Sequence, residues 1–168
     1  MVTGKTRQLL LSQGFPSTVL DGMPRIAGLA RWTPLACACC GVLGLVWGNG
    51  WYFLLLGFMT LTGGMTDRSV YDRLYNVLIM PIIGRGPIPP HGTPRRFGCT
   101  IGAMMYLLCG AGYFTHNAYL IYIPSCFIIT FAAIAGLTQW CFASAIYGAL
   151  FGPPDGCCGE SRDVEDRT

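Results

Sequence analysis

Charged residues are missing from two long windows of the sequence. No Asp, Glu, Lys or Arg lies between Trp32 and Thr66, or between Phe97 and Pro154. Only 11% of the 168 residues are charged and 52% are hydrophobic, whereas ordinary soluble domains carry about 25% charged residues. The two windows cannot form the surface of a water-soluble protein, so we expect both to lie in a membrane.

Each window is long enough for two membrane-spanning helices, because a bilayer core of about 30 Å takes about 20 helical residues. The first window divides at the turn Gly48-Asn49-Gly50, and the second divides at Thr115 to Tyr119. The sequence therefore predicts an all-α integral membrane protein with four transmembrane helices in two hairpins. The predicted spans are about 28–48, 51–66, 97–115 and 118–151. The last stretch is too long for one span at about 1.5 Å per residue, so we expect it to tilt, protrude or break near Gly136.

The remaining segments complete a division into five parts. We expect a basic N-terminal segment (1–27), a first transmembrane hairpin (28–66), an amphipathic helix with a Pro-rich loop (67–96), a second transmembrane hairpin (97–152) and an acidic tail (153–168). Apolar residues recur at helical spacing from Val70 to Ile83, which predicts an interfacial helix on the membrane surface. Pro81 is expected to bend or end this helix. The acidic tail either pairs with the basic loop or stays solvated and disordered.

The positions of Lys and Arg predict the orientation in the membrane. They precede the first span and lie between the second and the third, while both hairpin turns lack them. By the positive-inside rule, both termini and the central loop face the cytoplasm or the matrix of an organelle. The Arg-bearing, acid-poor N-terminal segment fits a mitochondrial address as well as a plain cytoplasmic N-terminus, and a secretory signal peptide is not expected.

Nine cysteines raise the question of metal binding or redox chemistry. Cys37 and Cys40 have Cys-x-x-Cys spacing, but inside a membrane helix they lack the turn of a redox motif, so packing is the alternative. Cys157 and Cys158 follow the last helix, where they are either free thiols or sites of reversible acylation. His91 and His116 are expected on opposite sides of the membrane and cannot share a metal. We therefore predict no metal, cofactor or catalytic residues.

The charge-free windows also argue against several classes of function. A proton pump or a transporter of charged substrates needs ionisable groups inside the membrane, and the two windows contain no Asp, Glu, Lys or Arg. Nucleotide-binding loops are absent from the sequence, and the modest basic loop does not favour nucleic acid as a partner. Instead, four arginines near the membrane surface are candidates for binding lipid headgroups, including anionic lipid such as cardiolipin. They are Arg68, Arg73, Arg95 and Arg96.

A polar stripe interrupts the last apolar stretch. It consists of Gln139, Cys141, Ser144 and Tyr147. No base lies at hydrogen-bonding spacing from Cys141, so nucleophilic catalysis lacks its parts, and the stripe is either a helix-packing surface or a thiol site. Close helix contacts are favoured by pairs of small residues four positions apart. These pairs are Gly44/Gly48, Gly98/Gly102, Ala132/Gly136 and Gly148/Gly152.

Three segments follow one another in an order that is typical of a known protein family. The segments "YDRLYNVLIMPIIGRGP", "PRRFGCTIGAMMYLL" and "QWCFASAIYG" together resemble a family of small bacterial four-helix integral membrane proteins of undetermined function. The resemblance covers about residues 24–151. In that family the last helix typically carries Cys-x-x-Cys followed by Tyr. This chain keeps Cys141 and Tyr147 but has Ser144 at the second cysteine position, which speaks against dithiol exchange.

The resemblance implies a function only indirectly. The N-terminal segment, the acidic tail and the many Cys and aromatic residues differ from the bacterial pattern and suggest a eukaryotic, organellar member. Our leading hypothesis is a non-catalytic accessory or structural subunit of a larger complex, such as the respiratory chain or ATP synthase of the mitochondrial inner membrane. Its partners are other transmembrane subunits and lipids, and a bacterial plasma membrane is the alternative location. A membrane protein that handles sulfur or electrons through Cys141, and a small transporter, are the alternative functions.

Overall fold

The computed structural model describes residues 4–15, 17, 20, 26–83, 86–90 and 92–152. Regular structure in these residues is helical throughout, which confirms the all-α prediction. The acidic tail, His91, Cys157 and Cys158 lie outside the described residues. The elements are α1 (Gly4–Ser12), α3 (Ile26–Ala30), α4 (Trp32–Trp47), α5 (Gly50–Met65), α6 (Val70–Leu74), the π-helical turn η1 (Tyr75–Ile79), α7 (Met80–Ile83), α8 (Thr93–Phe114), α9 (Ala118–Thr138) and α10 (Phe142–Phe151).

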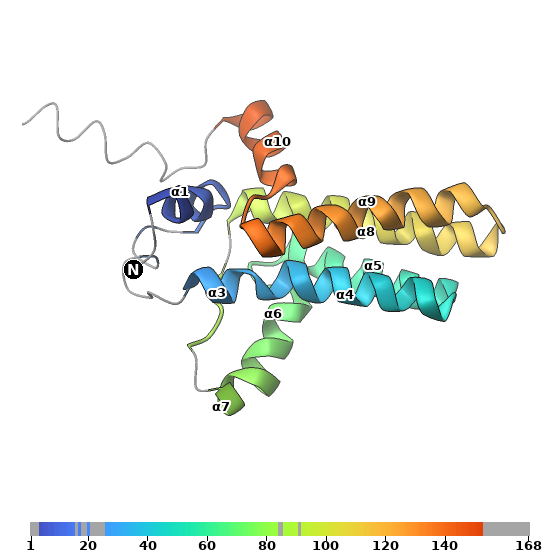
Figure 1. The fold of residues 1–168 in the computed structure, drawn as a ribbon, viewed down its shortest axis with the longest axis horizontal. Helices are drawn as coiled ribbons and strands as arrows, with labels where there is room; N and C mark the ends of the chain where they lie inside the picture. The colour runs from blue at the N-terminus through green and yellow to red at the C-terminus, as the bar shows by residue number, and fades with distance from the viewer. Residues whose placement is uncertain are drawn as a thin grey trace, which may run out of the picture.

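Four long helices, α4, α5, α8 and α9, lie side by side as a bundle (Figure 1). The two turns that join them in pairs lie at one end of the bundle, and α1, α6 and α10 lie at the other end. Each turn ends in an asparagine that caps the next helix. The Asn49 side chain accepts a hydrogen bond from Trp51 N at 2.9 Å, and that of Asn117 accepts one from Tyr119 N at 3.1 Å.

Three stretches are long and apolar enough to cross a membrane: Gly28–Trp47, Thr93–Phe114 and Ala118–Thr138. α5 is shorter, with 16 residues, and α10 has 10. The stretch 118–151 breaks near Gly136, which is one of the three outcomes that its length left open, and the break lies just after this glycine. α9 ends at Thr138 because Gln139 adopts a left-handed conformation with a φ of 62°, and α10 begins at Phe142.

The third helix of the bundle also differs from its expected range. α8 begins at Thr93 rather than at residue 97, because Pro94 is well suited to the first turn of a helix. Arg95 and Arg96 therefore belong to the first turns of α8 and not to the preceding loop. Because α8 begins four residues earlier than expected, the helix itself positions the guanidinium groups of Arg95 and Arg96.

Glycines bring α5 and α8 close together. A Cβ atom at Gly57 would lie 2.7 Å from Leu107 Cδ2, and one at Gly110 would lie 2.6 Å from Leu54 Cδ2. The leucine of each helix thus fills the space left by the glycine of the other. Phe53 and Tyr106 are fully buried beside this contact and form the centre of the core.

The segment from Val70 to Ile83 is helical, as its periodicity predicts, and it projects away from the bundle (Figure 1). Pro81 does not end it. The π-helical turn η1 comes just before α7, which contains Pro81, a residue without an N–H group for the helical ladder. Val77 and Ile82 are 70% and 83% exposed, so apolar side chains of this segment lack cover within the described chain.

Candidate functional site

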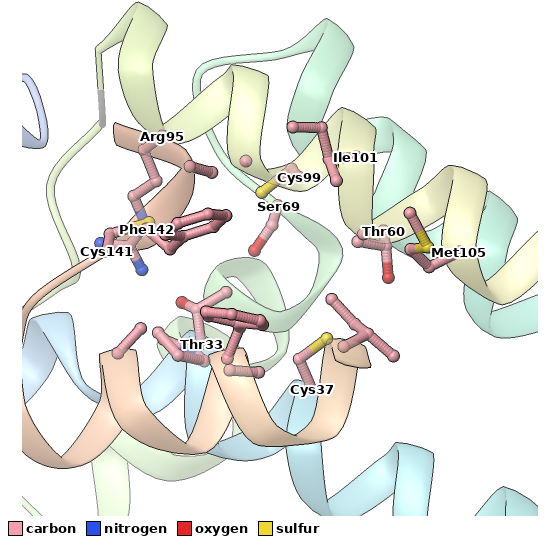
Figure 2. A pocket seen from close by; sticks show the side chains of 18 of the residues that line it. Thr33, Cys37, Thr60, Ser69, Arg95, Cys99, Ile101, Met105, Cys141 and Phe142 are labelled. Carbon is pink, nitrogen blue, oxygen red and sulfur yellow. The ribbon is translucent and has the colours of Figure 1, made fainter. Parts of the chain in front are cut away.

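A cavity of about 260 Å³ lies among α4, α8, α9 and α10, near the end of the bundle where α1 and α6 lie. Its wall is almost entirely apolar and includes Met105, Phe131 and Phe142. Figure 2 shows Arg95, Cys141 and Phe142 toward one end of the cavity, and Cys37, Thr60 and Met105 toward the other. This size and apolar character are suited to a small apolar or amphiphilic ligand.

Arg95 is the charged residue of this wall, and it is only 6% exposed. Its Nη2 donates a hydrogen bond to the carbonyl oxygen of Ala30 at 3.4 Å, and its guanidinium carbon lies 5.3 Å from the centre of the Phe15 ring. Its Nη1 is buried without a hydrogen-bond partner. We expected Arg95 at the membrane surface as a lipid-headgroup candidate, whereas the structure places it inside the protein.

The other polar side chains of the cavity wall have partners within the protein. The Thr33 hydroxyl donates to a carboxylate oxygen of Asp72, and Ser69 Oγ accepts from Asp72 N at 3.1 Å. The Thr60 hydroxyl lies 3.4 Å from the Tyr71 hydroxyl. Burial raises the pKa of Tyr71 above its ordinary value, so this phenol stays protonated.

Asp72 was not among the residues that the sequence singled out. It is fully buried and accepts hydrogen bonds from Thr33 and from Ser69 N, and with Ser69 it forms a capping box at the start of α6. The spacing Ser-x-x-Asp before an apolar run is a recognisable capping signal. This signal marks the start of the helix, but it does not reveal that Thr33 of α4 completes the site.

Three thiols from different parts of the chain line the same cavity: Cys37 from α4, Cys99 from α8 and Cys141 before α10. Cys37 also contacts Tyr106, whose hydroxyl donates to the Cys37 carbonyl oxygen at 2.7 Å. The two residues of the Cys-x-x-Cys pair have different surroundings: Cys37 is buried and lines the cavity, whereas Cys40 is half-buried and lies outside the cavity wall. Among the described residues, no three His, Cys, Asp or Glu side chains are grouped to bind a metal ion.

The residues of the polar stripe serve different parts of the fold. Gln139 is buried, and its carbonyl oxygen accepts a hydrogen bond from the Gln13 side chain. Cys141 borders the cavity, while Ser144 is buried without a partner for its hydroxyl. Tyr147 lies outside the wall, with its ring 5.8 Å from that of Phe97. The stripe therefore does not converge on a single chemical centre.

The remaining surface arginines have separate surroundings. Arg68 and Arg73 are exposed, as their candidacy for lipid headgroups requires. Arg96 pairs with Asp67 and donates from Nε to the Thr66 carbonyl oxygen at 3.2 Å, which fastens the start of α8 to the end of α5.

Comparison with known proteins gives one match. The family described as "Domain of unknown function (DUF4395)" matches residues 27–151. Neither a curated protein nor a solved structure matches the chain.

Proposed function

The chain belongs to the DUF4395 family, and we propose that it is a non-catalytic accessory or structural subunit of a larger membrane complex. In this role it binds partner helices and lipid. The observation that carries the proposal is the open face of α10. A Cβ atom added at Gly148 would meet no atom of the described residues within 4 Å.

Three glycines inside the bundle support this argument by contrast, although Gly48 in the first turn is also open. Cβ atoms at Gly44, Gly98 and Gly136 would each meet a neighbouring side chain, so those positions already serve contacts inside the protein. Small residues on membrane helices allow two backbones to approach closely. Because no described residue covers this face at Gly148, the face is available to a helix of another subunit. Ala145 and Ala149 are exposed beside Gly148 and enlarge the flat surface.

The position of the protein in the membrane is part of the proposal. We place it in the mitochondrial inner membrane, as a eukaryotic descendant of a bacterial family, with both termini on the matrix side. α5 is the fourth span of this proposal, since it is apolar and packs against both α8 and α4. Arg68 and Arg73, both exposed, bind anionic headgroups such as those of cardiolipin. The basic residues at one end of the bundle support this orientation.

Replacing Gly148 with Leu is expected to release the protein from its complex, because the larger side chain keeps a partner helix at a distance. The measurement is native gel migration with mass spectrometry, after extraction from the protein's own membranes in mild detergent. Ala111→Leu is the matched control, since Ala111 is an exposed small residue of α8 near the opposite end of the bundle. A wild-type protein that migrates alone, or a Gly148→Leu variant that stays in the assembly, would contradict the proposal.

The second candidate function is the handling of sulfur or electrons by thiols, and the shared cavity of Cys37, Cys99 and Cys141 is the observation that favours it. Cys141→Ser separates the two candidates. An accessory subunit is expected to keep its assembly and its function with this change, because Ser fills nearly the same space. A complete loss of function with normal assembly would instead assign the role to the thiol.

A further inference from the structure

The Nη1 atom of Arg95 is buried without a hydrogen-bond partner, and this observation is independent of the proposed subunit role. A guanidinium group stays protonated in proteins, so burial cannot remove its charge. A buried charge without a counterpart is strongly unfavourable. Arg95 is nevertheless only 6% exposed, and it borders a cavity. An acceptor group inside that cavity would give Arg95 Nη1 the hydrogen-bond partner that it lacks.

No side chain of the described cavity wall makes a hydrogen bond with this nitrogen. The hydroxyl groups of Thr33 and Thr60 are engaged by Asp72 and Tyr71. Both oxygens of the Asp72 carboxylate accept hydrogen bonds, from Thr33 and from Ser69 N. Thiols and apolar side chains make up most of the remaining wall, and neither is a strong acceptor. A ligand in the cavity can supply the acceptor that Arg95 Nη1 lacks.

The shape of the site limits the chemistry of that ligand. The cation lies toward one end of the cavity, and the apolar part of the wall extends away from it to Met105 (Figure 2). Arginine binds planar or tetrahedral oxyanions through paired N–H groups. A volume of about 260 Å³ lies near the lower end for ligand pockets, which favours one narrow chain over a whole two-chain lipid.

We propose that the cavity binds a single-chain amphiphile with its oxyanion head on Arg95 and its apolar chain among α4, α8 and α9. Two sources share this chemistry. One is the carboxylate of a free fatty acid, and the other is the phosphate of a lipid that inserts one chain. Because Cys141 lies at the same end of the cavity as Arg95, a bound headgroup also covers this thiol.

The test uses the full chain in nonionic detergent with laurate, methyl laurate and lauroyl lysophosphatidate as ligands. Binding is followed in two ways: by the rise in unfolding temperature with ligand concentration, and by the rate at which Cys141 is alkylated, read by peptide mass spectrometry. Laurate or lauroyl lysophosphatidate is expected to stabilise the protein and to slow the alkylation of Cys141. Whichever ligand binds more tightly identifies the source of the oxyanion.

Arg95→Gln is expected to weaken this binding by about tenfold or more, because a hydrogen bond to a charged group is lost. Arg96→Gln is the matched control, since Arg96 pairs with Asp67 and does not line the cavity. The proposal is overturned if Arg95→Gln binds as tightly as the wild type, or if Cys141 is not protected. Methyl laurate keeps the chain without the charge, so equal stabilisation of the wild type by this ester would also overturn it, even if Arg95→Gln failed to fold.

Discussion

Replacing Asp72 with Ala is expected to lower the free energy of unfolding by about 3 kcal/mol, because buried donors lose a charged acceptor. The Thr33 hydroxyl and Ser69 N both donate to the Asp72 carboxylate, and the side chain is fully buried. Without it, the contact between α4 and α6 loses its polar centre. The measurement is unfolding of the purified protein in mixed detergent micelles, followed by circular dichroism.

Asp67→Ala is the matched control for this experiment. The Asp67 side chain is 68% exposed and pairs with Arg96 at the surface, and an exposed ion pair contributes about 1 kcal/mol at most. Asp72→Asn adds a second comparison, because the amide keeps one acceptor but removes the charge. If Asp72→Ala were no more destabilising than Asp67→Ala, the carboxylate would not anchor α6 to the bundle.

Replacing Gly112 with Ala is expected to destabilise the protein by about 2 kcal/mol, which is typical of overpacking. The added Cβ atom would lie 2.8 Å from the carbonyl carbon of Leu120 and 2.9 Å from Ile121 N. Both are backbone atoms of α9, so a change of side-chain rotamer cannot relieve the clash. α8 and α9 would have to separate next to the turn that joins them.

Gly148→Ala is the control for the overpacking experiment. It makes the same chemical change in a helix, but the new methyl group meets no atom within 4 Å. We expect unchanged or slightly higher stability, because Ala is the better helix former. The same unfolding measurement serves both variants. An equal loss of stability in both would show that the close approach of α8 and α9 is not the cause.

The helices, the turns between them and the amphipathic segment follow from the sequence alone, because they depend on local residues and on an apolar environment. A membrane leaves no water to satisfy backbone groups, so a long charge-free stretch must form helices. The two turns are marked by local chemistry, since Asn49 and Asn117 cap the following helices wherever the rest of the protein lies. The amphipathic pattern from Val70 to Ile83 is equally local. Sequence position correctly marked Arg68 and Arg73 as exposed, but it failed for Arg95, which is buried.

The break in the last apolar stretch illustrates what the sequence left open. Length and Gly136 indicated that a break was possible near this residue; α9 continues through Gly136, where Leu35 of α4 packs against the glycine, and ends two residues later. The helix is capped by Gln139, which is buried and whose carbonyl oxygen accepts a hydrogen bond from Gln13. The sequence thus indicated a break near Gly136, but the contact with Gln13, which lies far away in the chain, could not be predicted from local pattern.

Arg95 shows the same limit for the candidate site. Next to Arg96 and a Pro-rich loop, it has the sequence context of a surface cation, yet it lies under Phe15 and beside the cavity. The sequence by itself determined the long apolar helices, their turns and the end of the bundle that carries charge, because the burial of charges and backbone groups in an apolar surrounding is costly at every position. Only the tertiary structure decided which side chains meet in the cavity, because helix packing brings together α4, α8, α9 and α10, and their pairing depends on contacts between residues far apart in the chain.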